Sequence, residues 1–113
     1  MDGIYSIRFR GAADWGMGLL MFRKGKIVGA DVAGVQYDGT YSENEKEIFV
    51  QIVMSVPAGV TLVQGYPAQP KAFEVPFEAT VAKLAIESSE PILMRLPHGP
   101  VNVIFSFLRE LND

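Results

Sequence analysis

The sequence contains no cysteine. This absence excludes disulfide bonds, thiolate catalysis, and zinc or iron–sulfur sites held by cysteine. Histidine is almost as scarce, because the only one, His98, lies in a Pro97-His98-Gly99-Pro100 segment that is typical of a turn. A general base needs an orienting partner in a cleft, and no Ser/His/Asp set surrounds His98 in the sequence. We therefore expect a protein that is not an enzyme.

Excess positive charge and long apolar runs are also missing. Ten Lys and Arg residues stand against thirteen Asp and Glu residues, which gives a net charge of −3. A non-specific grip on nucleic acid requires clustered Lys and Arg, so we expect no direct nucleic-acid contact. No apolar run approaches the roughly 18–20 residues of a membrane span. Charged Asp2 and Arg8 surround only a short apolar run, which is not the pattern of a signal peptide. We expect a cytoplasmic protein with no membrane contact.

Apolar residues are abundant, at 49% of the chain against 20% charged residues. That proportion lets a chain of 113 residues build one hydrophobic core, and it predicts a single domain over residues 1–113.

The stretch from Gly16 to Gly34 gives the clearest hairpin signal. Two apolar runs, Leu19–Phe22 and Ile27–Val32, flank the sequence Arg23-Lys24-Gly25-Lys26. Glycine takes the positive φ of a tight turn without steric cost, so Gly25 marks the turn. Both runs are apolar at most positions instead of alternating strictly. This predicts a central hairpin that is covered on both faces.

Alternating apolar side chains or turn residues at both ends predict strands elsewhere. These segments are Ile4–Phe9, a short strand beginning at Thr40 after an Asp38-Gly39 turn, Ile48–Val56, Thr61–Tyr66, Ala72–Thr80, Pro91–Leu96 and Val101–Leu108. Pro76 has no N–H to donate, so its strand is expected at an edge or a bulge. Residues Glu78–Ile86 fit either a loop or one short helical turn. About eight antiparallel strands predict an all-β barrel or sandwich, and a closed barrel would leave no free edge.

Asp31 and the segment Ser42–Glu47 are polar places whose roles need an explanation. Asp31 stands in an apolar run, where an isolated carboxylate is costly unless it is hydrogen-bonded. A buried hydrogen-bond network is the favoured role, and contact with a ligand is the alternative.

The segment Ser42–Glu47 is the most polar of the chain. Its alternating glutamates provide oxygen ligands, but the EF-hand pattern with its central glycine is absent, so no metal site is expected. It fits a solvated turn with a Ser42–Glu45 capping box, or an acidic contact surface for a basic partner.

A longer pattern runs over residues 2–50. It consists of Asp2-Gly3-Ile4-Tyr5-Ser6-Ile7 with Phe9, then Gly16, Gly18, Lys24-Gly25, Ile27, Gly29 and Asp31, then Tyr37, Gly39, Tyr41-Ser42-Glu43 and Glu45. This pattern resembles the GrlR family of bacterial negative regulators of type III secretion. The resemblance implies a lipocalin-like β-barrel of about eight strands. It also implies a homodimer with a non-enzymatic role, which binds a helix-turn-helix transcriptional activator and keeps it from DNA.

The family's contact with its activator is a Glu-Asp-Glu-Asp run after a serine. The matching positions here are Ser42 and then Glu43, Asn44, Glu45 and Lys46. The resemblance makes these five residues the candidate partner-binding site. Two acids are kept, one position is neutral and one has reversed sign, so attraction to a basic surface is expected to be weaker.

A rival hypothesis places function inside the barrel. Lipocalin-like barrels can enclose a small hydrophobic ligand, whereas other small barrels are filled by side chains. No cofactor is expected in either case. The residues expected to line such a cavity are Ile7, Met21, Val50, Ile52, Met54 and Phe105.

Overall fold

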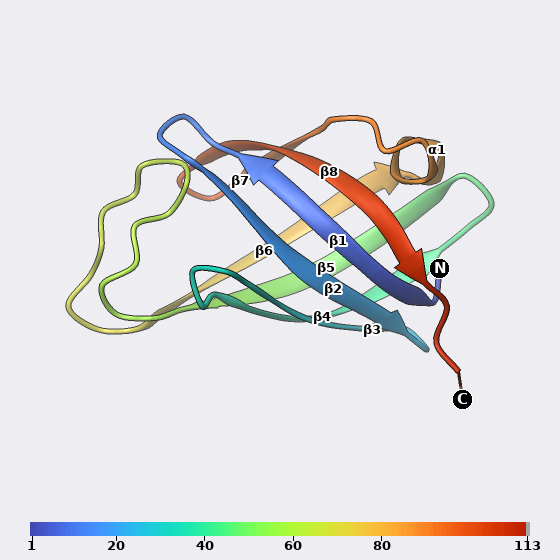
Figure 1. The fold of residues 1–113 in the computed structure, drawn as a ribbon, viewed down its shortest axis with the longest axis horizontal. Helices are drawn as coiled ribbons and strands as arrows, with labels where there is room; N and C mark the ends of the chain where they lie inside the picture. The colour runs from blue at the N-terminus through green and yellow to red at the C-terminus, as the bar shows by residue number, and fades with distance from the viewer. Residues whose placement is uncertain (113) are drawn as a thin grey trace.

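The computed structural model describes residues 1–112 and shows one curled antiparallel sheet with a short helix (Figure 1). The elements are β1 (Gly3–Arg10), β2 (Trp15–Arg23), β3 (Lys26–Asp31), β4 (Gln36–Glu43), β5 (Glu47–Val56), β6 (Phe73–Ala82), α1 (Lys83–Glu87), β7 (Ile92–Leu96) and β8 (Gly99–Arg109). The prediction of an all-β antiparallel barrel of eight strands is confirmed. Asp113, the last residue of the predicted domain, lies outside the described residues.

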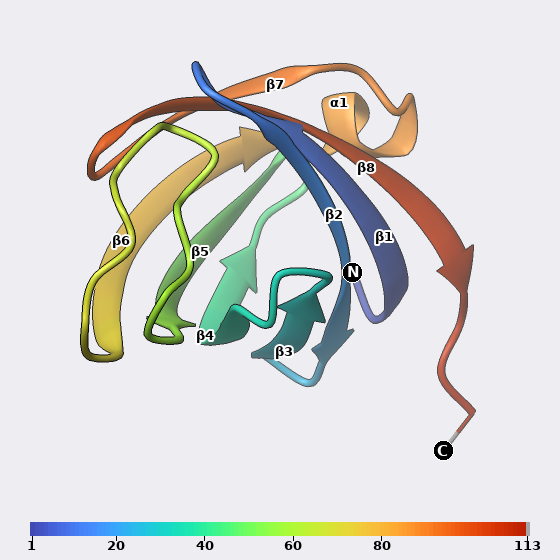
Figure 2. The same cartoon turned by 60° about the vertical axis from the view of Figure 1, so that its left-hand side comes forward.

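The barrel is nearly closed. The strand order is β6-β5-β4-β3-β2-β1-β8-β7, and Figure 2 shows how the sheet curls round on itself. Within residues 1–112 no strand pairing joins β6 to β7, so each of these two strands keeps one unpaired edge. Pro76 lies in β6, which pairs only with β5. The predicted edge position of this proline is confirmed, since an edge strand tolerates a residue without an N–H.

The hairpin of β2 and β3 stands in the middle of the sheet, as predicted. Lys24 and Gly25 form its turn with φ values of 47° and 82°, the positive pair that a tight type I′ turn requires. The expectation that both faces are covered is wrong. Phe22 and Ile27 point inward and are buried, while Leu19 on the outer face is 50% exposed.

The structure corrects two local predictions, a strand and a turn, and decides a third between a loop and a helical turn. Residues 61–66 form no strand and belong to the long connection of residues 57–72 between β5 and β6. Asp38 and Gly39 lie inside β4, because the turn falls earlier, where Gly34 has a φ of 90°. The segment predicted as a loop or a helical turn contains α1, at Lys83–Glu87.

Two segments outside the sheet contribute buried side chains to the core, one at each end of the barrel. Ile86 of α1 is 4% exposed, and α1 contacts both β6 and β8. Leu62 of the long connection is 5% exposed, and that connection lies at the opposite end of the long axis from α1 (Figure 1). The helix and the long connection therefore cover the two ends of the sheet and enclose the space between them.

Candidate functional site

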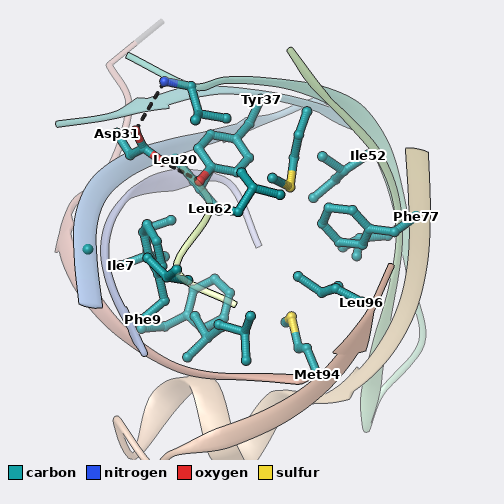
Figure 3. Close-up of a pocket in the computed structure, with 18 of the residues that line it drawn as sticks. Ile7, Phe9, Leu20, Asp31, Tyr37, Ile52, Leu62, Phe77, Met94 and Leu96 are labelled. Carbon is teal, nitrogen blue, oxygen red and sulfur yellow. Dashed lines mark hydrogen bonds between the residues drawn. The ribbon is translucent and has the colours of Figure 1, made fainter. Parts of the chain in front are cut away.

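A cavity of about 110 Å³ lies inside the barrel (Figure 3). Its wall combines inward-facing side chains of the strands with Ile86 of α1 and Leu62 of the long connection. Nearly all of the lining side chains are apolar, and the polar ones are Asp31, Tyr37, Thr61 and Gln64. Such a wall favours an apolar occupant over water.

Five of the six residues expected at a cavity do line it, namely Ile7, Val50, Ile52, Met54 and Phe105. The placement of Met21 inside is wrong. Leu20 and Phe22 face the interior, so the alternation of the strand puts Met21 on the outer face, where it is half-buried. Because β2 is apolar at nearly every position, its sequence does not show which side chains face inward.

Other lining residues were not predicted, among them Phe77, Met94 and Leu96 (Figure 3). For Phe77 the sequence carried a usable signal, since Phe73, Val75 and Phe77 alternate along one face of β6. Met94 and Leu96 alternate in the same way along β7.

A hydrogen-bonded pair, Asp31 and Tyr37, supplies two of the four polar side chains of the wall (Figure 3). The Tyr37 hydroxyl donates to Oδ2 of Asp31 at 2.7 Å. Oδ1 of Asp31 accepts from the backbone N–H of Ala33 at 2.9 Å and of Val35 at 3.1 Å. The hydrogen-bonded role favoured for Asp31 is confirmed, but its expected burial is wrong, because Asp31 is only half-buried.

The protonation state of Tyr37 follows from its surroundings. Tyr37 is buried, and burial together with the charge of Asp31 raises the pKa of its hydroxyl well above the usual value. The hydroxyl therefore keeps its proton at neutral pH and donates a hydrogen bond to Asp31.

The long connection is fastened over its end of the barrel at two points. The carbonyl of Val63 accepts from the N–H groups of Ala13 at 2.9 Å and Asp14 at 3.1 Å, between β1 and β2. The ring of Tyr66 stacks on His98 with centroids 3.8 Å apart. His98 lies in the turn between β7 and β8, as predicted, with a φ of 73°. These contacts hold Leu62 against the cavity.

The structure brings Ser42, Glu43, Asn44, Glu45 and Lys46 together at the exposed turn between β4 and β5. The expected Ser42–Glu45 capping box does not form, because Ser42 belongs to β4. Instead, Oδ1 of Asn44 accepts from the N–H groups of Lys46 at 2.9 Å and Glu47 at 2.8 Å. Asn44 thus shapes the turn through its side chain, as Asx-turn residues do.

The acidic side chains of this turn differ in their surroundings. The Glu43 carboxylate contacts Nζ of Lys83 at 2.5 Å and the Met1 amino group at 2.7 Å. These hydrogen bonds lower the pKa of Glu43 below its usual value, and the one from Lys83 has the largest effect. Two cations already offset the charge of Glu43, so the negative charge that the turn presents to its surroundings comes mainly from Glu45 and Glu47.

Fold and cavity together define a β-barrel with an apolar interior and one polar pair in its wall. No protein-family model and no curated protein matches the chain. Among residues 1–112 no cluster of three or more acidic or histidine side chains is placed to hold a metal ion. In the same part of the chain, no helix is both long and apolar enough to cross a membrane.

Proposed function

We propose that the protein is a non-enzymatic, cytoplasmic regulatory protein that acts by binding another protein, as in the GrlR family that residues 2–50 resemble. In this proposal it forms a homodimer and holds a helix-turn-helix transcriptional activator through the turn at Ser42–Lys46. The observation that carries the proposal is an exposed apolar strip on the outer face of the barrel. A surface of this kind supports protein–protein contact.

The outer strip consists of side chains of β2 and β3 that point away from the cavity. Its members are Trp15, Met17, Leu19, Met21 and Val28. Trp15 is 61% exposed, and Met21 lies directly across from Val28 in the pairing of the two strands. The strip is therefore continuous across the central hairpin.

Charges on both sides of the outer strip favour a second copy as its occupant. Arg8 and Arg10 lie on β1, opposite Met17 and Trp15, and Asp38 lies on β4, opposite Val28. The two flanks thus carry opposite charges. A two-fold arrangement uses the same patch on both subunits, so each copy can offer its acid to the partner's bases.

Leu19→Lys is expected to convert the dimer to a monomer at micromolar concentration, because it buries a charge in an apolar interface. Light scattering after size-exclusion chromatography measures the mass of each species. Leu93→Lys is the matched control, since Leu93 is 52% exposed on β7, away from the strip. A monomeric wild-type protein, or a Leu19→Lys variant that stays dimeric, contradicts this interface.

The proposed contact with an activator rests on the charge of the turn. Glu45 and Glu47 are exposed, whereas Glu43 is engaged by Lys83. Lys46 lies between Glu45 and Glu47 in the sequence, and its positive charge weakens the negative potential of their carboxylates. We therefore expect a salt-sensitive complex with a basic surface that is weaker than one formed by four acids.

Glu45→Lys combined with Glu47→Lys is expected to lower recovery of a helix-turn-helix protein at least several-fold when the immobilised protein is exposed to a native lysate. The physical reason is repulsion between the new lysines and a basic partner. Quantitative mass spectrometry measures the recovery at low and high salt. The control is Glu74→Lys, an exposed acid on β6 near the other end of the barrel. If the double variant and the Glu74→Lys control recovered equal amounts of the helix-turn-helix protein, the turn would be ruled out as the contact.

A second function is favoured by the cavity itself. Its volume of about 110 Å³ and its apolar wall suit a small hydrophobic ligand. Drug-sized ligands occupy pockets of roughly 300–1,000 Å³, so a lipid would not fit without rearrangement of the wall.

A further inference from the structure

We infer that the cavity binds an uncharged molecule the size of one aromatic ring that carries a single hydrogen-bond donor, and that Asp31 accepts this hydrogen bond. This inference rests on the second proposed function, binding of a small hydrophobic ligand. It adds the size, charge and polarity of that ligand.

The size follows from the volume. An apolar cavity of roughly 150 Å³ in another protein stays dry and binds benzene. The cavity here measures about 110 Å³ and has a wall of the same character. Because this cavity is smaller than the benzene site, a single ring is the upper range of what fits without movement of the wall, and its hydrogen-bond donor can be no larger than one hydroxyl or amino group.

The polarity follows from the hydrogen bonds of the Asp31–Tyr37 pair. A carboxylate has about four acceptor sites. In Asp31, Oδ1 accepts two backbone hydrogen bonds and Oδ2 accepts one from Tyr37, which leaves one site on Oδ2. The Tyr37 hydroxyl has committed its only hydrogen to Asp31, so it offers lone pairs alone. Both groups of the pair can accept a hydrogen bond from a ligand, and neither can donate one.

The other polar side chains of the wall, Thr61 and Gln64, belong to the long connection. The Gln64 amide Nε2 donates one of its two hydrogens to the carbonyl of Pro97 at 3.4 Å, and Thr61 is exposed. A carboxylate ligand would therefore meet the negative charge of Asp31 without a donor from the pair. A ligand with an O–H or N–H group, by contrast, finds an acceptor at the polar part of an otherwise apolar wall.

Three probes of similar size separate these possibilities. Phenol carries a donor, toluene has none, and benzoate is an anion with acceptors only. Titrations of the full chain, followed by NMR shifts of the cavity methyl groups, give the affinity for each probe. We expect phenol to bind about tenfold more tightly than toluene, as one hydrogen bond to a charged group provides, and benzoate not to bind.

Two variants assign the hydrogen bond to its acceptor. Asp31→Asn should bring the phenol-to-toluene ratio close to one, because the amide is a weaker acceptor. Tyr37→Phe should keep or raise the ratio, because it frees a second site on Oδ2. A general loss of packing would lower the ratio in both variants, whereas we expect it to fall only in Asp31→Asn. Thermal unfolding of both variants checks that they fold.

The outcomes test the role of Asp31 separately from the proposed binding of a small hydrophobic ligand. Equal binding of phenol and toluene, unchanged in Asp31→Asn, would overturn the role of Asp31 and leave a purely apolar site. Binding of benzoate in preference to phenol would also overturn it. Shifts with none of the three probes would overturn the ligand-binding function as well.

Discussion

Replacing Phe22 by alanine is expected to lower the free energy of unfolding by about 3–5 kcal/mol. Phe22 is 2% exposed and makes edge-to-face contacts with Tyr5 and Tyr41, each with ring centroids 5.3 Å apart. Alanine removes both contacts and enlarges the space inside the barrel. Single domains are stable by only about 5–15 kcal/mol, so the loss is a large part of the total. Urea denaturation followed by circular dichroism measures it.

Leu93→Ala serves as the control for Phe22→Ala. Leu93 is 52% exposed on β7, and its truncation should change stability by no more than about 0.5 kcal/mol. If Phe22→Ala cost no more than this control, Phe22 would not be part of a packed core. A large loss in the control would point instead to an unrecognised contact on the outer face of β7.

Much of the fold could be predicted because local signals and the barrel agree. The turn at Lys24 and Gly25 follows from glycine between apolar runs, and the edge position of β6 follows from Pro76. The inner and outer faces of β2 could not be predicted in this way. Its inner face packs in the core while its outer face forms the exposed strip, and both are apolar. Only pairing with β1 and β3 fixes which side is buried.

The candidate site was predictable where alternation was clear. Val50, Ile52 and Met54 alternate along β5 and line the cavity together. The partner of Asp31 could not be predicted, because Asp38 and Gly39 resemble a turn and that turn would remove Tyr37 from the sheet. In the structure the chain turns before Val35, so Tyr37 enters β4 facing inward and reaches Asp31.

Some residues of the pattern proposed to resemble the GrlR family lie on β3 and β4. Gly29, Asp31, Tyr37 and Gly39 face the interior of β3 and β4. Ser42 and Glu43 end β4 at the exposed turn. Asp31 and Tyr37 line the cavity, and Ser42 and Glu43 belong to the turn proposed to contact an activator.

The inward glycines also explain how β4 lies so close to its neighbour. A Cβ at Gly39 would stand 2.1 Å from the carbonyl oxygen of Gln51 in β5, closer than any real contact allows. Because that atom belongs to the backbone, it cannot move aside without separating the two strands. Gly39→Ala is therefore expected to destabilise the protein by about 3 kcal/mol, at the upper end of the usual cost of overpacking.

Chemical denaturation measures the effect of Gly39→Ala, and Thr40→Ala on the same strand is its control. Thr40 is exposed on the outer face, so its truncation should cost no more than about 1 kcal/mol of strand preference. The backbone N–H signals of Gln51 and Ile52 should shift strongly in Gly39→Ala and little in Thr40→Ala, because only the new methyl group of Gly39→Ala presses on β5. Equal stability of the two variants would mean that β4 and β5 leave room for a side chain at this position.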